Sequence, residues 1–350
     1  MQNCIYLPRF THILLSCCEP SGANIFSMSG HYLGARGKFA AGGMFLFLYY
    51  CLLIAYIAGG APLLGFLLKT SCGIELSKGA ALALFGMLFG GIVWLGSKAI
   101  DRVNLILSIS MMGAYVMLVS IGSSEVSIAK LTEGAWSKVF LALPVLFCAF
   151  GFHNVVPSLC TYLERDKPSL KRSIFCGTGI ALIVFLVWQW LILGSLSQEA
   201  IQTALAAGQP VTAALQSLTG KHSLFALGQG FAFFALVTSF LGVAFSVVDF
   251  LNDGLQLKGK KRPLLVVLTF LPPALCALLS PGIFETALGI AGGFGEAFLN
   301  GLLPVVLAWK YRSLAKERGC QEAISGRGML ITLFAFGLFV IGLETVFLLA

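Results

Sequence analysis

A small polar cluster interrupts one long apolar stretch of the sequence. Gly151, His153, Asn154 and Pro157 all lie within one short segment of this stretch. Pro157 cannot donate the backbone hydrogen bond that would reach the carbonyl of His153, and its ring clashes with that carbonyl, so a regular helix cannot continue there. Asn154 can cap a new helix that has Pro157 in its first turn. We therefore predict a helix that is broken near Phe150–Asn154, close to the middle of the membrane.

The chemistry available at such a break is recognition of a small charged molecule by the backbone. Unpaired peptide groups at membrane depth persist only where protein or a water-filled cavity surrounds them. The first turn of a half-helix carries partial positive charge that can face a substrate carboxylate. His153 is ionisable at membrane depth, which makes it a functional candidate. The alternative is an ordinary proline kink beside a buried histidine.

A second apolar segment carries a stripe of polar and small residues. Ser239, Gly242, Ser246 and Asp249 recur at helical spacing, and Thr238 lies beside them. Such a face should turn toward other helices or a cavity, because lipid would leave it unsatisfied. Packing between helices is the alternative for the hydroxyl groups, and solvation at the membrane interface is the alternative for Asp249.

A third apolar segment repeats this spacing with Gly289, Gly292, Glu296 and Asn300. Glu296 lies near the centre of the predicted span, where an ionised carboxylate is costly, so we expect it to be protonated, paired or exposed to a wet cavity. Proton or substrate handling is the functional hypothesis, and a structural hydrogen bond is the alternative. Glu344, close to the end of the chain, is expected at the membrane interface without a role.

Three tyrosines lie in the first apolar stretch, residues 39–60. Tyr49 and Tyr56 share one helical face, and Tyr50 is adjacent. Packing against neighbouring helices is the commoner use of aromatic residues at this depth, and lining of a substrate cavity is the alternative.

The elements that hold these residues are membrane-spanning helices. The 350 residues are 58% hydrophobic and only 11% charged, with a mean hydropathy of +0.91, whereas soluble domains carry about 25% charged residues. The apolar stretches lack the period-two alternation of a membrane barrel. We predict an all-α integral membrane protein. Its expected partner is the lipid bilayer, and we expect no binding of nucleic acid. Its nine spans are predicted at 39–60, 79–97, 103–121, 139–161, 173–195, 223–250, 264–280, 284–308 and 329–349.

The distribution of basic residues predicts the orientation. If the N-terminus is cytoplasmic, eighteen of the 23 Lys and Arg residues lie on the inner side, as the positive-inside rule requires. The outer side then has only Lys69, Lys78, Lys130, Lys138 and Lys221. Nine crossings place the C-terminus on the outer side, which is the periplasm in a bacterial inner membrane.

The sequence lacks the motifs of the main enzyme classes considered. It contains no H-E-x-x-H zinc motif, no G-x-S-x-G nucleophile elbow and no G-x-x-x-x-G-K-[ST] phosphate loop. We therefore expect neither an enzyme nor a bound cofactor or metal.

Longer motifs resemble one known family. The run AFGFHNVVPSLCTYL at 149–163 is similar to the aromatic amino acid permeases of bacteria, the tyrosine- and tryptophan-specific transport proteins, as are LVTSFLGVAFSVVDFLNDG at 236–254, LTFLPPALCALLSPGIF at 268–284 and LPVVLAWKYR at 303–312. The tyrosine-specific branch has the greater resemblance.

The resemblance implies a LeuT-like fold with two inverted repeats, of which this chain would contain family helices 3–11. It also implies import of an aromatic L-amino acid, with tyrosine as the expected substrate, together with a coupling cation, H⁺ or Na⁺, with the proton favoured. Gly151 and His153 would form the unwound segment, Asn154 would orient the amino acid, and Thr238 and Ser239 would supply oxygen ligands, with Glu296 as the protonatable group. The expected substrate-binding residues are Phe150, Gly151, Phe152, His153, Asn154, Tyr50, Tyr56 and Ser239, and the expected ion-coupling residues are Thr238, Ser239 and Glu296.

The resemblance also divides the chain into two regions. Residues 1–38 are expected to be an N-terminal cytoplasmic segment, a remnant of the second family helix plus a loop, and residues 39–350 the transport domain. The family's Gly-rich first helix has no counterpart before residue 39, so we expect a chain shortened by about two spans. The alternative hypothesis is an inactive permease remnant or a membrane scaffold.

Overall fold

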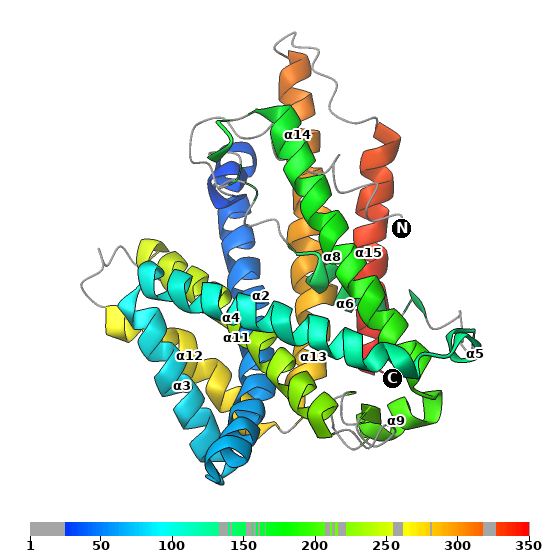
Figure 1. Ribbon diagram of the computed structural model, residues 1–350. Coiled ribbons are helices and arrows are strands. Elements are labelled where there is room, and N and C mark those ends of the chain that lie inside the picture. The colour runs from blue at the N-terminus through cyan, green and yellow to red at the C-terminus, as the bar shows by residue number, and fades with distance from the viewer. Residues whose placement is uncertain are drawn as a thin grey trace. The chain divides into compact units, whose positions relative to one another are not determined.

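The computed structural model describes most of the chain, and the described part is helical (Figure 1). Its described residues are 25–132, 139–140, 142–151, 156, 159, 162–164, 166–206, 211, 214–215, 222–254, 262–280, 282–317 and 327–349. None of these residues lies in a β-strand. The helices are α2 Ile25–Cys72, α3 Lys78–Leu95, α4 Ser97–Gly122, α5 Ile128–Leu131, α6 Leu143–Ala149, α8 Lys167–Ser195, α9 Gln198–Ala206, α11 His222–Gly254, α12 Arg262–Leu279, α13 Ile283–Ile290, α14 Leu303–Glu317 and α15 Arg327–Leu349, with a 3₁₀ turn η1 Ser123–Glu125 and a π-helix η3 Ala291–Leu302.

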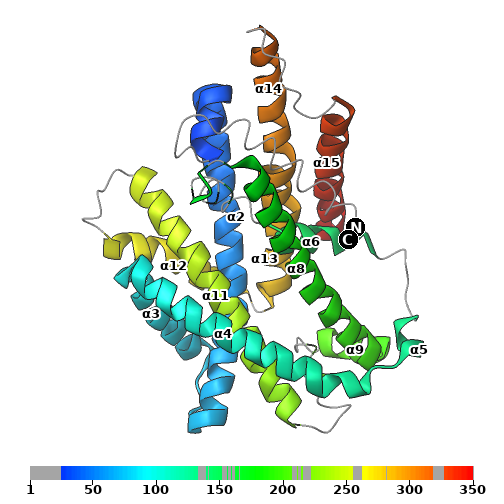
Figure 2. The ribbon, with the colours of Figure 1, turned by 45° about the horizontal axis from the view of Figure 1, so that its top comes forward.

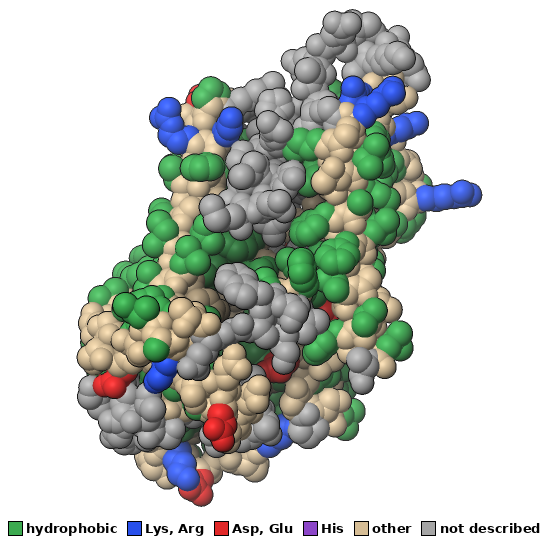
Figure 3. Space-filling model, turned by 90° about the vertical axis from the view of Figure 1, so that its right-hand side faces the viewer, with side chains coloured by type: hydrophobic (Ala, Val, Ile, Leu, Met, Phe, Trp, Pro, Cys, Tyr) green, Lys and Arg blue, Asp and Glu red, His purple; other side chains and the backbone are tan. Residues whose placement is uncertain are grey.

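Eight helical segments of the described chain are long and apolar enough to cross a membrane. Each overlaps one of the nine predicted spans. The predicted span 139–161 has no such counterpart, because α6 ends at Ala149 and several later residues of that span lie outside the described part. Hydrophobic side chains cover much of the surface visible in Figure 3, and most of the described Lys and Arg residues lie near helix ends or between helices. This distribution is typical of a protein that spans a bilayer.

Two predicted spans differ from the observed helices. The first, 39–60, is too short, because α2 begins at Ile25 and ends at Cys72. Gly34 interrupts α2 with a φ of 72°, a conformation that glycine adopts without the steric cost paid by other residues. The span predicted at 284–308 is not one α-helix, since Ala291–Leu302 is π-helical between α13 and α14.

The chain forms two compact units. The first unit contains residues up to Leu48, Ser137–Val184 and Leu288–Ala350. Within it, η3 packs against α6, α14 and α15, and α14 lies beside α15 in both ribbon views (Figures 1 and 2). A small apolar core of Val305, Ala308 and Leu330 joins α14 to α15.

The second unit contains Tyr49–Trp136 and Phe185–Ala287. Here α11 packs against α4, α12 and α3, and α4 crosses α11 in both ribbon views (Figures 1 and 2). Its core is a set of edge-to-face phenylalanines. The Phe85 and Phe240 ring centroids are 5.1 Å apart, as are those of Phe240 and Phe270. Aromatic pairs in this geometry contribute about 0.5–1.5 kcal/mol each beyond the burial of their area.

Basic side chains bind the carboxyl ends of helices in the second unit. Arg262 donates to the carbonyl of Val93 at 3.1 Å, at the end of α3. Lys78 donates to the carbonyl of Leu278 at 3.3 Å, at the end of α12. Because the last carbonyls of a helix lack intrahelical partners and carry partial negative charge, these contacts stabilise the helix ends.

Candidate functional site

The helix break predicted from the sequence begins at the end of α6. Pro144 lies in the first turn of this short helix, where a missing amide hydrogen costs little. Phe150, with φ −107° and ψ 18°, ends the helix, and Gly151 is not helical. The prediction of a break is therefore confirmed at Phe150 and Gly151.

Three of the predicted site residues lie beyond this point. Phe152, His153 and Asn154 are outside the described residues. Their roles in substrate binding, and the capping of a second half-helix by Asn154, therefore stay predictions.

The described end of the break lies against Glu296. A Cβ atom placed on Gly151 would be 2.7 Å from Cδ of Glu296 and would overlap its carboxylate oxygens. Glu296 itself is only 3% exposed. A side chain at position 151 would therefore require the Glu296 carboxylate to move, and the structure brings two predicted site residues together.

The Glu296 carboxylate is positioned by the π-helix that carries it. Asn300, one turn later, donates from Nδ2 to Oε2 of Glu296. Oδ1 of Asn300 is buried and has no hydrogen-bond partner among the residues that the structure describes. Buried polar atoms are paired in nearly all proteins, and an orphaned acceptor therefore marks a place where a further donor can bind.

Glycines allow η3 to approach α6 this closely. A Cβ on Gly292 would overlap the carbonyl oxygen of Pro144 and lie 3.3 Å from Cβ of Cys148. A Cβ on Gly295 would lie 2.8 Å from Cβ of Leu48. π-Helical segments are rare and occur often at functional sites. The sequence pattern identified Gly292 and Glu296 but neither Gly295 nor the π-helical backbone.

A cavity of about 270 Å³ adjoins the break in the first unit. Phe150 and Gly151 line it from the end of α6, and Thr178 lines it from α8. Thr178 satisfies its hydroxyl by donating to the carbonyl of Ile174 at 2.8 Å. The remaining lining residues are Ala149, Val156, Leu159, Ser173, Ile174, Gly177 and Ala181. Its mainly apolar wall and its size, just below the usual range of roughly 300–1,000 Å³, suit a small ligand with an apolar part.

Tyr50, a predicted substrate contact, has a structural partner in the second unit. Its hydroxyl donates to the carbonyl of Leu268 on α12 at 2.9 Å. Pro272 lies four residues after Leu268 and lacks the amide hydrogen that would normally pair with this carbonyl. Tyr50 therefore satisfies a backbone group that Pro272 leaves free, as neighbouring helices commonly do in membranes.

The other predicted residues of the second unit are accessible to different degrees. Tyr56 is half-buried, and Thr238 is half-buried and donates to the carbonyl of Ala235 at 3.0 Å. Ser239 is exposed, whereas Val237 and Phe240 on the opposite side of α11 are buried. The polar stripe thus faces away from the core of its unit, and its packing against other helices or a cavity stays a prediction.

The predicted site residues thus fall into two groups. The first unit brings Phe150, Gly151 and Glu296 together. Tyr50, Tyr56, Thr238 and Ser239 belong to the second unit.

The sequence interpretation gave Glu344 no role, and its position near the membrane interface stays a prediction. The structure adds that this residue is 3% exposed and packed inside the first unit. A signal was present in the sequence, since an acidic residue within an apolar membrane helix is costly and is usually functional.

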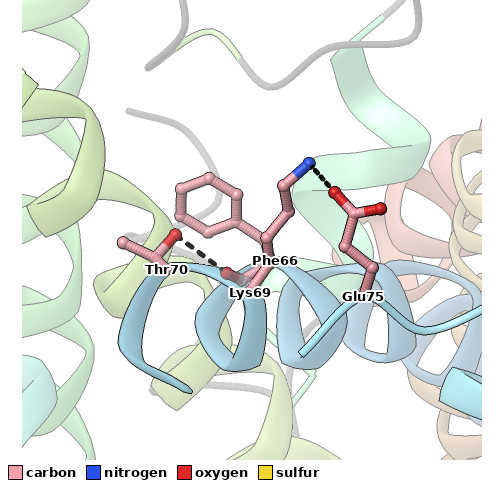
Figure 4. A network of polar contacts seen from close by, with 4 residues as sticks. All are labelled: Phe66, Lys69, Thr70 and Glu75. Atoms are coloured by element: carbon pink, nitrogen blue, oxygen red, sulfur yellow. Dashed lines mark hydrogen bonds and ion pairs between the residues drawn. The ribbon is translucent and has the colours of Figure 1, made fainter. Parts of the chain in front are cut away.

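A larger cavity, of about 610 Å³, is lined by residues of the second unit and by none of the predicted site residues. Lys69 and Glu75 line it and form an ion pair of 2.5 Å (Figure 4). The hydrogen bond and charge of Lys69 hold the pKa of the Glu75 carboxyl below its ordinary value. Both side chains are largely exposed, so the pair contributes little to stability.

Comparisons with known proteins agree with the resemblance. The profile of the tryptophan/tyrosine permease family matches residues 10–344. The tyrosine-specific transport system 1 of Haemophilus influenzae is 34% identical over 300 residues, which cover 83% of this chain and 74% of that protein. The tryptophan-specific transport protein of Pseudomonas aeruginosa is 30% identical over 331 residues, covering 91% and 78%. The tyrosine-specific transport system 2 of Haemophilus influenzae is 33% identical over 296 residues, covering 82% and 72%. The chain belongs to the tryptophan/tyrosine permease family.

Proposed function

We propose that the chain is a permease that imports an aromatic L-amino acid, with tyrosine preferred over tryptophan, by symport with a proton. Membership of the family and relatives named for tyrosine and tryptophan transport support this substrate class. The observation that carries the mechanism is the end of α6 at Phe150 and Gly151 against the buried Glu296. The location is a bacterial inner membrane, with a cytoplasmic N-terminus.

The broken segment is proposed to bind the amino acid backbone of the substrate. Peptide groups freed by the break replace water around the ammonium and carboxylate groups, and Asn154 caps the following half-helix. The cavity beside Phe150 gives the aromatic ring an apolar environment close to these groups. Burial of a ring in such a cavity supplies most of the affinity, and the backbone contacts fix its orientation.

Glu296 is proposed to carry the coupled proton. Its burial supports this role, because a carboxylate in a low-dielectric interior is costly unless it is protonated or compensated. The Asn300 amide that contacts it holds the carboxyl group in one orientation. The competing coupling ion is Na⁺, for which the hydroxyl oxygens of Thr238 and Ser239 would be the ligands.

Transport by the purified chain in lipid vesicles tests the proposal. We expect saturable uptake of labelled tyrosine that an inside-alkaline pH gradient drives and a Na⁺ gradient does not. Unlabelled tyrosine should compete best, tryptophan less and leucine least. If the correctly folded chain shows no uptake and no binding of tyrosine, that result refutes transport. It would then support the inactive-remnant or scaffold hypothesis.

A further inference from the structure

The last helix contains a buried acidic residue that the proposed mechanism does not use. Glu344 is the only acidic residue of α15, which runs from Arg327 to Leu349. Its side chain is 3% exposed, while the next residue, Thr345, is exposed. Glu344 therefore points into the first unit.

Two glycines form the surface against which Glu344 packs. A Cβ on Gly289 would be 2.7 Å from Oε1 of Glu344. A Cβ on Gly293 would overlap Cβ and Cγ of Glu344. Gly289 and Gly293 are four residues apart and lie on one face of the α13–η3 segment. The stem of Glu344 thus crosses Gly293, and its carboxyl group reaches Gly289.

The carboxyl group has no polar partner in this groove. Within the described part of the chain, Glu344 makes no hydrogen bond or ion pair. Arg327, the basic residue of its own helix, lies seventeen residues earlier, about 25 Å along the axis. Lys310 and Arg312 are on the part of α14 that packs near Leu330, toward the opposite end of α15.

Among the side chains that the structure describes, no positive charge therefore compensates Glu344 from the elements that pack against it. η3 contributes Glu296, which has the same sign of charge, and α6 contributes the Cys148 thiol. An ionised carboxylate in such surroundings is expensive, because neither water nor a cation stabilises it. A neutral carboxyl group has no such cost. Besides Glu344, the titratable and charged residues on these helices are Cys148, Glu285, Glu296, Lys310, Tyr311, Arg312, Lys316, Glu317 and Arg327.

We propose that Glu344 is a second proton-binding residue of the transport cycle. Its neutral carboxyl group packs into the groove of Gly289 and Gly293. Release of the proton to water leaves a carboxylate, and this charge drives α15 away from η3 until water reaches it. Because η3 also carries Glu296, protonation of Glu344 controls the position of the helix that holds the first proton. The inference rests on the proposed function.

The test compares Glu344→Gln with the wild-type chain in two transport assays. Exchange of external labelled tyrosine for internal tyrosine needs no net proton movement, whereas accumulation driven by a pH gradient does. We expect Glu344→Gln to lower accumulation by about tenfold, a typical size for a coupling effect. Exchange should fall far less. Glu285→Gln, on an exposed carboxylate of α13, should behave as the wild-type chain in both assays.

A stability measurement tests the proton site without transport. The neutral form of Glu344 fits the groove, so wild-type thermal stability in detergent should fall as the pH rises through the titration of this carboxyl group. Glu344→Gln, which stays neutral, should lose this fall, and Glu285→Gln should keep it. The proposal would be overturned if Glu344→Gln showed the same pH dependence of accumulation and of stability as the wild-type chain. Absence of exchange in the wild-type chain would instead refute the proposed function, and the stability comparison would still decide the proton site.

Discussion

The contact between Gly151 and Glu296 is a size match between one residue without a side chain and one buried carboxylate. Gly151 ends the described part of the broken segment, and Glu296 fills the space that a Cβ would occupy. The match fixes the distance between α6 and η3. A change of volume at either residue must therefore move the Glu296 carboxylate or the backbone beside it.

Gly151→Ala should impair transport for this reason. The added methyl group overlaps the Glu296 carboxylate, and overpacking of this kind costs about 1–3 kcal/mol. We expect the kcat/KM for tyrosine uptake to fall by about tenfold, which corresponds to 1.4 kcal/mol. Glu296→Asp, which shortens the side chain, should recover part of the packing loss, as measured by thermal stability of the double variant.

A matched control is available on α8. A Cβ on Gly179 has no heavy atom within 4 Å, so Gly179→Ala should transport as the wild-type chain does. An equal loss of uptake in Gly151→Ala and Gly179→Ala would contradict the size match.

Tyr50→Phe should lower stability and leave substrate affinity unchanged. The variant loses the hydrogen bond to the Leu268 carbonyl, which is worth about 0.5–1.5 kcal/mol. Thermal unfolding in detergent measures the loss, and the KM for tyrosine uptake measures affinity. In a Pro272→Ala background, residue 272 can donate to the same carbonyl, so the Tyr50→Phe substitution should cost less there. A raised KM without loss of stability would restore Tyr50 to the substrate site.

At the scale of elements, hydrophobic length predicted the spans well. Residues 103–121 and 173–195 lie wholly within α4 and α8, because a run of about 20 apolar residues has few alternatives to a membrane helix. The start of α2 at Ile25 was missed, since Arg36 and Lys38 made this region look like a loop although both residues are good helix formers. The π-helix was also missed, because side chains four residues apart share a face in either helix type.

The loop between α2 and α3 provides a test at the scale of elements. Lys69 lowers the pKa of the Glu75 carboxyl in the folded protein, chiefly by a hydrogen bond and then by its charge. The contribution of this pair is therefore present at neutral pH and disappears as the pH falls through the folded pKa. Lys69→Gln should raise the pKa of Glu75 toward its ordinary value. Carbon NMR of labelled glutamate side chains, assigned with Glu75→Gln, measures the change, and an unaltered pKa would show that Lys69 does not bind Glu75 in solution.

At the scale of the whole molecule, composition and motifs predicted the class and family, whereas the assembly of the site was predicted only locally. The sequence placed a break near Asn154 because proline chemistry is local. It could not place Glu344, since the groove of Gly289 and Gly293 is formed by a helix far away along the chain. Tyr50 was likewise assigned to the substrate site, since its hydrogen-bond partner on α12 is distant in sequence and could not be predicted.

Orientation in the membrane is a property of the whole chain and has a direct chemical test. Cys72 is an exposed free cysteine at the end of α2, and the positive-inside distribution places this end in the periplasm. A membrane-impermeant maleimide should therefore label Cys72 in intact cells, and Cys72→Ser should remove that label. Ser97 is exposed at the start of α4, on the side predicted to be cytoplasmic. A cysteine introduced at position 97 in the Cys72→Ser background should react only after the cells are opened, because the bilayer separates the two ends of α3. The opposite result would be labelling of position 97 in intact cells and no labelling of Cys72 in the wild-type chain. It would show that the topology is the reverse of the predicted one, with most Lys and Arg residues on the outer side.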